Sequence, residues 1–520
     1  MGASQEHRGS VLKWDDMSDR SVLTRRDFVA GASALVAGAR AWAGTTAAAS
    51  SLSDLSAAEA VARMRRGELS SESYAEALLE RCTSAKALNA FITLEPDHVL
   101  RDARAADQLR ARGAKLGPLH GLPIPVKDSV NTRDYPTSAG TAALRHFRPA
   151  KDAPLLSQLR AAGAIVLGKT NLHELSYGWS SNNHAFGAVH NPYDPSRVPG
   201  GSSGGTAAAV AAHLAPLGIA ADTEGSIRVP AAVCGLVGFR PTTGRYSSAG
   251  VAPITALFDQ VGPIARSMRD IELFDTVVAG EHGPLAVPEL GTVRLAVCRT
   301  YFFDGLEPEV ARITDAALTK LKAAGVTLVE TEIPELGDLV GKITDQVQYH
   351  DTQPSLTHYL AEYGTGVTFQ ELVAQASDDI RATFAQYVLA GGSDVVTDAV
   401  YRKAVDDYLP RLRAVLRETF ARTGTAALVF PATMTTAPRI GDDGMLLLGG
   451  RKVSFEDAMS RNIAPGSTAG VPGLVIPAGL AANGMPVALE FDGPAGSDRA
   501  LLGLGAAIER LLGTEPPPRI

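Results

Sequence analysis

Apolar residues recur along this chain with two different periods. Stripes at helical spacing occur twice within 55–87, where Ser56 and Ser70 stand at the expected N-terminal caps. Further helices are predicted over 99–112, 153–162, 310–324 and 501–512. Short apolar runs typical of buried strands occupy 90–94, 122–126, 165–168, 294–297, 327–329, 427–431, 474–477 and 486–491. Helices and strands that alternate in this way predict an α/β fold.

The same pattern indicates how the chain is divided. Residues 44–54 form a linker of mostly small residues. Residues 345–421 are mostly helical in pattern and richer in aromatic side chains, so we interpret them as a helical insertion on the substrate side. Because no second linker interrupts the chain, we predict one large domain over 55–515.

Residues 1–43 have the features of a targeting segment. Arg25 and Arg26 stand just before an aromatic residue, a moderately apolar run follows over 30–39, and Ala-Trp-Ala at 41–43 fits a cleavage site. The mild hydrophobicity of the run favours a twin-arginine signal. We expect a periplasmic or secreted protein, or a cytoplasmic one if the signal is not used. Met17 is an equally good start, which would make the preceding residues an extension.

Composition narrows the classes of function. The 520 residues are 45% hydrophobic and 20% charged with a net charge of −7, as in a globular protein with a sizeable core. The chain has no Lys/Arg-rich block, so we expect no nucleic-acid partner. Its three cysteines stand far apart, which favours neither a disulfide framework nor a zinc site. We expect no metal, no cofactor and no stable membrane anchor, and either a monomer or a homodimer.

Two glycine-rich turns carry the candidate chemistry. Ser202 stands within 199–206 and Ser226 within 222–228, and the run of small residues at 207–212 separates them. Glycine beside serine lets backbone N–H groups approach a bound atom closely, which suits a nucleophile and its oxyanion hole. Flexible Gly/Ser loops are the plainer interpretation, but a linker would not alternate with apolar, helix-forming runs.

Two motif matches in this region do not fit their chemistry. Residues 163–170 match the letters of a phosphate-binding P-loop, but the residues between the glycines form an apolar strand rather than an amide-exposing loop. Residues 200–204 match the G-x-S-x-G nucleophile elbow, but three prolines in 191–199 replace the strand that such an elbow requires. We therefore reject nucleotide binding and a Ser-His-Asp triad.

Lys127 is the best candidate for a base. It ends the apolar run 122–126, so burial of its amine is plausible. Desolvation disfavours the charged form of a lysine and lowers its pKa. A neutral amine could then accept a serine proton. Taken alone, Lys127 fits equally well as a solvated residue at a strand end.

The chain resembles the amidase signature family from about residue 55 to 512. The matching stretches occur in order at 121–128, 168–171, 191–192, 199–205 and 225–228, and the two serines have the family's spacing. The resemblance implies a single large domain with a mixed, mostly parallel central sheet covered by helices. It also implies a small-molecule amide substrate.

The resemblance assigns roles to individual residues. It implies that Ser226 is the acyl-forming nucleophile, that Ser202 bridges after a cis peptide bond, and that Lys127 is the general base. The implied oxyanion hole consists of backbone N–H groups of Thr223, Glu224, Gly225 and Ser226, and the implied supporting residues are Ser203, Asp222 and Arg228. The family usually has glycine in place of Glu224, so we expect this side chain to point away from the oxyanion.

Local stretches at 238–246, 461–467 and 490–498 look like those of the mandelamide and indoleacetamide hydrolases in this family. They imply a small primary arylacetamide that is cleaved to a carboxylic acid and ammonia. Ser176, Tyr177 and Trp179 are candidate pocket residues, although the two aromatic rings fit core packing as well.

Other functions stay open at this point. One is hydrolysis of bulkier anilides, carbamates or amino-acid amides, and Thr255–Asp259 departs from the subgroup's usual stretch. A more remote one is a component of a tRNA-dependent amidotransferase, which the export signal and the acidic charge disfavour. A non-catalytic binding protein would require that Glu224 disables the site.

Overall fold

The computed structural model of this chain describes residues 51–519. The chain from Leu52 onward gathers into one compact unit. The predicted signal segment 1–43 and most of the linker 44–54 lie outside the described residues.

Eleven strands form one central sheet in the described part of the chain, in the order β1-β3-β2-β6-β8-β7-β14-β15-β11-β9-β10. Their bounds are Phe91–Thr93 (β1), Pro123–Lys127 (β2), Ile165–Thr170 (β3), Leu217–Asp222 (β6), Val237–Arg240 (β7), Gln260–Ala265 (β8), Arg294–Val297 (β9), Thr327–Glu330 (β10), Ala427–Pro431 (β11), Gly473–Leu480 (β14) and Pro486–Asp492 (β15). Two separate ribbons pair Asn182–Asn183 (β4) with Gly187–Ala188 (β5), and Met445–Leu448 (β12) with Arg451–Ser454 (β13).

The sheet is mixed, as predicted. Parallel pairing occurs in two blocks, β3-β2-β6 and β11-β9-β10. The pairs between these blocks, and the edge pair of β1 with β3, are antiparallel. Parallel pairing is therefore concentrated in two parts of the sheet rather than running through all of it.

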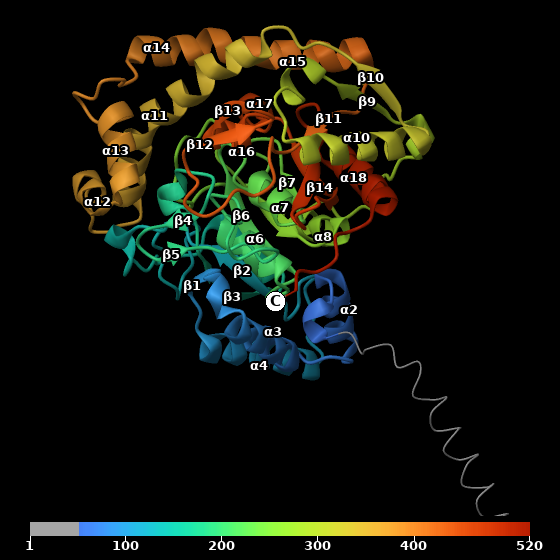
Figure 1. Cartoon of the computed structure of the whole chain (residues 1–520). Helices are drawn as coiled ribbons and strands as arrows, with labels where there is room; N and C mark the ends of the chain where they lie inside the picture. The colour runs from blue at the N-terminus through green and yellow to red at the C-terminus, as the bar shows by residue number, and fades with distance from the viewer. Residues whose placement is uncertain (1–50, 520) are drawn as a thin grey trace, which may run out of the picture. The chain divides into compact units, whose positions relative to one another are not determined.

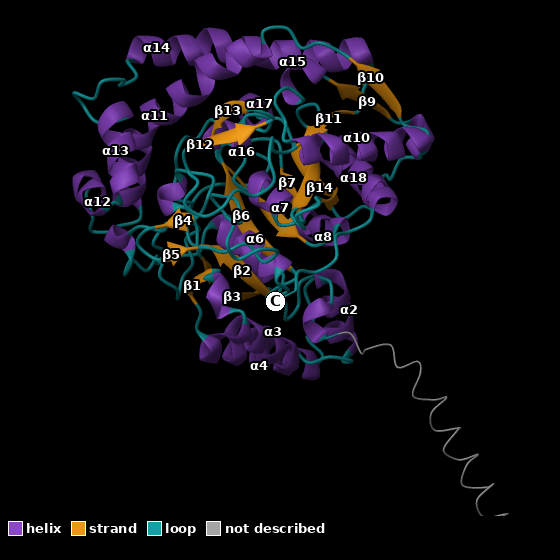
Figure 2. Cartoon of the chain, viewed as in Figure 1, coloured by secondary structure: helices purple, strands orange, loops and turns teal. Residues whose placement is uncertain are grey.

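Helices surround the sheet, and Figure 2 shows the strands in the middle of them. Their bounds are Ala57–Arg66 (α2), Ser71–Ser84 (α3), Pro96–Ala111 (α4), Pro154–Ala161 (α5), Gly204–Ala211 (α6), Arg228–Val233 (α7), Met268–Val278 (α8), Arg299–Phe302 (α9), Pro308–Ala323 (α10), Leu336–Glu362 (α11), Phe369–Gln375 (α12), Asp378–Tyr387 (α13), Asp398–Lys403 (α14), Leu409–Thr423 (α15), Phe455–Ser460 (α16), Ala464–Ala469 (α17) and Asp498–Leu512 (α18). The prediction of one large α/β domain with helices over a central sheet is confirmed.

Alternate strand residues enter different cores, which shows that both faces of the sheet are covered. Leu474 and Ile476 of β14 join a core with residues of α2, α5, α8, α10 and α18. Val475, between them, joins a second core with residues of α6 and α7. Small residues of α6 let it pack closely there, since all eight of its residues are buried.

Helices fill the stretch between β10 and β11. Figure 1 shows α11, α14 and α15 together on one side of the domain, away from α2, α3 and α4. The long helix α11 packs on α14 and α15 and also on α17. In the part of the chain that the structure describes, no helix combines the length and apolar character that a membrane crossing requires.

Most of the predicted elements are present within a few residues of their expected ends. Ser56 and Ser70 cap α2 and α3 by accepting hydrogen bonds from the backbone N–H groups of Glu59 and Ser73. The periodicity does not predict β6, β7 or β8. These strands are rich in glycine and alanine and buried on both faces, so they carry neither alternation nor a strong β-branched signal.

Candidate active site

Lys127 is the last residue of β2 and is fully buried. Parallel pairing with β3 on one side and β6 on the other fixes this strand within the sheet, and Lys127 lies opposite Thr170. The apolar run that identifies the strand in the sequence is therefore also what takes the amine out of water.

The Lys127 amine contacts Ser202. Nζ donates a hydrogen bond of 2.7 Å to Ser202 Oγ and lies 3.5 Å from the carbonyl oxygen of Ala221. Ser203 Oγ donates to the same carbonyl at 3.1 Å. The structure thus brings together Lys127, Ser202 and Ser203, which are far apart or merely adjacent in sequence.

The turn before Ser202 has the predicted cis peptide bond, between Gly201 and Ser202. Glycine is required there, because a Cβ on Gly201 would lie 2.8 Å from the backbone carbon of Trp179. The Ser202 carbonyl accepts hydrogen bonds from His173 N and Ser181 Oγ at 3.0 and 3.2 Å. The turn is held from both sides, which fixes the position of the Ser202 hydroxyl.

Burial lowers the pKa of Lys127 to about 7, against the opposing charges of Asp222 and Asp259. The ordinary value for a lysine is 10.5. Half of the amine is therefore neutral near pH 7, and the fraction grows as the pH rises. A neutral amine that touches a serine hydroxyl can act as a general base.

Ser226 stands in the turn between β6 and α7. The Asp222 carboxylate shapes this turn by accepting the N–H of Gly225 at 2.7 Å and that of Ile227 at 3.1 Å. Ser226 is 6% exposed, and its hydroxyl makes no hydrogen bond with any described residue. The hydroxyl is therefore available to a ligand.

The four predicted oxyanion donors are not equivalent. The Gly225 N–H is taken up by Asp222, so it is not available to an oxyanion in this structure. Within residues 51–519, the N–H groups of Thr223, Glu224 and Ser226 donate to no protein atom. Trp179 Nε1 donates to the Glu224 carbonyl at 3.0 Å and so holds the turn from the other side.

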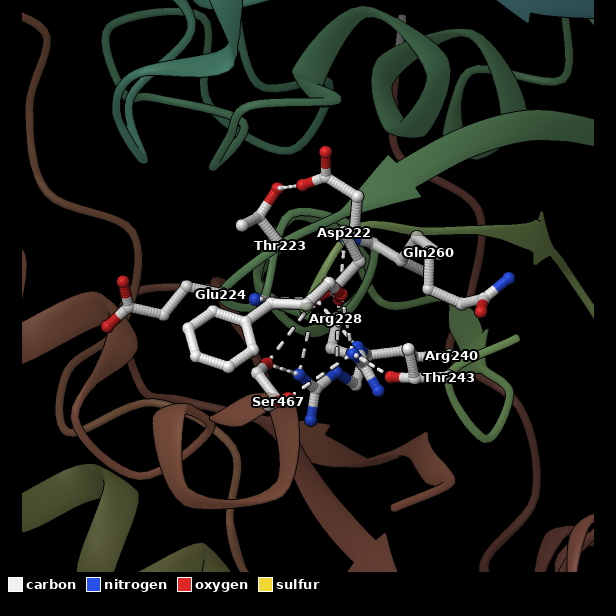
Figure 3. Close-up of polar contacts among 12 residues, drawn as sticks. Asp222, Thr223, Glu224, Arg228, Arg240, Thr243, Gln260 and Ser467 are labelled. Carbon is white, nitrogen blue, oxygen red and sulfur yellow. Dashed lines mark hydrogen bonds and ion pairs between the residues drawn. The ribbon is translucent and has the colours of Figure 1, made fainter. Parts of the chain in front are cut away.

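The Glu224 side chain points away from the Asp222 and Arg228 network, as Figure 3 shows. Its carboxylate accepts a 2.6 Å hydrogen bond from Gln348 Nε2 of α11. The charges that act on Lys127 come from Asp222 and Asp259 and not from Glu224. The expectation that Glu224 points outward agrees with this geometry.

Two buried arginines surround Asp222 (Figure 3). Arg228 Nε donates to Asp222 Oδ2 at 3.1 Å, and Arg240 Nε lies 3.4 Å from Oδ1. Arg228 also bonds to Glu490 of β15 and Ser467 of α17. Burial opposes ionisation of Asp222, but the two guanidinium groups outweigh it and hold the Asp222 pKa below its ordinary value. Asp222 and Arg228 thus lie behind the nucleophile turn.

Two cavities meet at the serines. The larger, about 350 Å³, reaches Lys127 and Ser202. The smaller, about 190 Å³, reaches Ser226. Ser176, Thr223 and Ile254 line both, so the cavities adjoin at the predicted reaction centre.

The predicted pocket residues have mixed positions. Ser176 lines both cavities, and Tyr177 and Trp179 line the smaller one. Tyr177 also packs edge-on against Phe384 at 5.1 Å and bonds to Thr352, so it serves the core as well. Both interpretations of Tyr177 therefore hold at once.

Asp259 is a functional residue that the sequence does not predict. It accepts hydrogen bonds from Thr223 Oγ1 at 2.6 Å and Ile254 N at 2.8 Å, and it lines the larger cavity. Burial raises its pKa to about 6. The stretch Thr255–Asp259 stands out in the sequence only as a departure from a pattern, which gives no hint of this contact.

Lys169, the lysine of the rejected P-loop match, is part of the core. It is buried in β3, 3.1 Å from Asp128, and donates to Val130 O and Thr137 Oγ1 at 2.9 and 2.8 Å. These contacts leave it no role toward a nucleotide, in agreement with the prediction of a core strand.

A family model described as Amidase matches residues 73–502. The chain belongs to the amidase family. Its chemistry is the hydrolysis of amides, as it is for the hydrolases named below.

Relatives of known name cover most of this amidase. An indoleacetamide hydrolase of Agrobacterium vitis is 37% identical over 88% of this chain and 97% of its own. A mandelamide hydrolase of Pseudomonas putida is 38% identical over 89% of this chain and 93% of its own. A glutamyl-tRNA(Gln) amidotransferase component of Chloroflexus aurantiacus is 34% identical over 88% and 97%.

Solved structures share the fold. A crystal structure described as that of an amidase has a TM-score of 0.78 at 32% identity and covers 88% of this chain and 100% of its own. The native peptide amidase of Stenotrophomonas maltophilia has a TM-score of 0.76 at 29% identity and covers 90% and 98%.

Removal of Arg228 tests the charge cluster behind the turn. Arg228→Ala would leave the buried carboxylates of Asp222 and Glu490 without their main cation, so we expect a loss of about 3–5 kcal/mol in the free energy of unfolding. Arg228→Lys should lose less, because it keeps a charge. Urea denaturation measures both.

The matched control is Arg312→Ala, which removes an exposed arginine paired with Glu309 and should change the midpoint little. Equal midpoints for Arg228→Ala and wild type would contradict the role given to the cluster.

Proposed function

We propose that this amidase cleaves a small, aryl-substituted carboxamide to a carboxylic acid and ammonia through an acyl-enzyme on Ser226. The observation that carries the proposal is the buried 2.7 Å hydrogen bond between Lys127 Nζ and Ser202 Oγ beside the free hydroxyl of Ser226. That bond supplies a neutral base for a serine nucleophile.

In the first half of the proposed reaction, Ser226 Oγ attacks the amide carbon. Its proton passes to Ser202 Oγ, whose own proton passes to Lys127 Nζ. The carbonyl oxygen becomes an oxyanion, for which Thr223, Glu224 and Ser226 offer free N–H groups. One such donor is typically worth about 100- to 1000-fold in rate.

Collapse of the oxyanion breaks the C–N bond. The proton held by Lys127 returns through Ser202 to the leaving nitrogen, which departs as ammonia. A water molecule then attacks the Ser226 ester and gives its proton to Ser202 and Lys127. The acid leaves, and the Ser226 hydroxyl is restored when the proton returns to it.

The substrate class has two kinds of support. The named relatives at 37% and 38% identity act on indoleacetamide and mandelamide, both of which are small aryl amides. The larger cavity suits an aryl group, since Val251, Ala252, Pro253 and Ile254 form one of its walls. Bulkier anilides, carbamates and amino-acid amides are the alternative substrates. The amidotransferase relative is similar over as much of the chain, but the predicted export signal disfavours that role.

Serine-directed labelling tests the catalytic residues. A fluorophosphonate probe should label Ser226, and Ser226→Ala should abolish labelling and reduce amide hydrolysis by about 1000-fold or more, because the nucleophile is gone. Lys127→Ala should retain the hydroxyl but label slowly. Peptide mass spectrometry identifies the labelled residue.

Ser84→Ala is the control for this test, because Ser84 is exposed at the end of α3, and it should label and turn over like wild type. Normal turnover in Ser226→Ala or Lys127→Ala would refute the proposed triad.

We also propose export through the twin-arginine route, from the sequence of residues 1–43. Changing Arg25 and Arg26 to lysine keeps the charge but removes the arginine pair, so the protein should stay in the cytoplasm. Cell fractionation measures its location, with Arg20→Lys as the control. Undiminished periplasmic protein in the double variant would contradict the proposal.

A further inference from the structure

The smaller cavity, which reaches Ser226, continues into an outer groove of about 650 Å³. Asp345, Tyr349 and Glu456 line both hollows. Asp345 and Tyr349 belong to α11 and Glu456 to α16, so two elements far apart in sequence build this side of the site.

Carboxylates are the only ionisable charges along this route among the described residues. Glu224 lines the smaller cavity, Asp345 and Glu456 line both hollows, and Asp394 lines the groove. Within residues 51–519, no lysine, arginine or histidine lines either hollow. Glu224, Asp345 and Glu456 also form no ion pair in that part of the chain. The field there is negative and is not compensated by the protein.

The carboxylates destabilise one another's charge. Burial and the charge of Asp345 raise the pKa of Glu224, and burial and the charge of Asp345 raise that of Glu456 to about 7. Burial and the charge of Asp457 raise the pKa of Asp345. A cation placed among these groups would relieve the repulsion.

Aromatic rings complete the walls. Tyr177, Trp179 and Tyr349 line the smaller cavity, and Tyr349 stacks on Tyr387 at 4.5 Å. Aromatic faces attract ammonium groups, so rings and carboxylates together favour a cation. The contact with chemistry is Ser226, whose buried hydroxyl lines the same cavity and has no partner in the described chain.

We infer that the smaller cavity binds a protonated amine of the substrate, so that the preferred amides carry an amino group near the scissile carbonyl. The inference rests on the proposed function and narrows its substrate class. The aryl group would occupy the larger cavity, and the ammonium group would lie among Glu224, Asp345 and Glu456.

A matched pair of amides tests this inference. 3-Amino-3-phenylpropanamide and 3-phenylbutanamide differ by an ammonium in place of a methyl group. Ammonia release should give kcat/KM about tenfold higher for the amino compound, since a hydrogen bond to a charged group is worth about that much. The pH should lie above the pKa of Lys127 and below that of an aliphatic amine.

The variant Asp345→Asn/Glu456→Gln removes two carboxylates at nearly constant volume, and it should lower the ratio of the two kcat/KM values about tenfold. The control Asp338→Asn/Glu418→Gln makes the same change of charge at exposed sites away from both hollows, and its ratio should equal that of wild type. Circular dichroism checks that all variants fold.

Equal kcat/KM for the two amides, a preference for the methyl compound, or an unchanged ratio in Asp345→Asn/Glu456→Gln would each overturn the inference and leave amide hydrolysis standing. Failure to hydrolyse either amide would instead overturn the proposed function, and the inference with it.

Discussion

The desolvation of Lys127 is the constraint on which the site depends. A lysine at the end of a buried strand loses its hydration, and the negative charges of Asp222 and Asp259 only partly replace it. The amine then shares its proton readily with the one group it touches closely, Ser202 Oγ. The strand pairing of β2 with β3 and β6 is therefore part of the chemistry, because it keeps the amine in place and dry.

The second constraint is the ion cluster behind Ser226. Asp222 accepts two N–H groups of the turn and is itself held between Arg228 and Arg240. Removal of one charge from such a cluster leaves the others buried without compensation, so the whole cluster fixes the turn as one unit. This explains why the free N–H groups of Thr223 and Glu224 can be held in position without protein partners of their own.

The sequence predicts the parts of the site that lie in short contiguous motifs. Lys127, Ser202 and Ser226 stand in apolar or glycine-rich stretches whose local chemistry is visible in the residue order. Strand β6, which leads into the nucleophile turn, is missed because its buried Leu-Gly-Ile-Ala-Ala-Asp pattern has no alternation. The walls formed by Asp345, Gln348 and Glu456 are missed for another reason. They come from α11 and α16, and only the tertiary packing brings them to Ser226.

The central claim is that the Lys127 amine is neutral at ordinary pH, and direct titration tests it. Protein labelled with ¹⁵N at the lysine Nζ positions gives a resonance for this amine, which Lys127→Met identifies by its loss. The account predicts a transition near the pKa of about 7 that burial imposes. An amine that stays protonated up to the ordinary lysine value of 10.5 would contradict it.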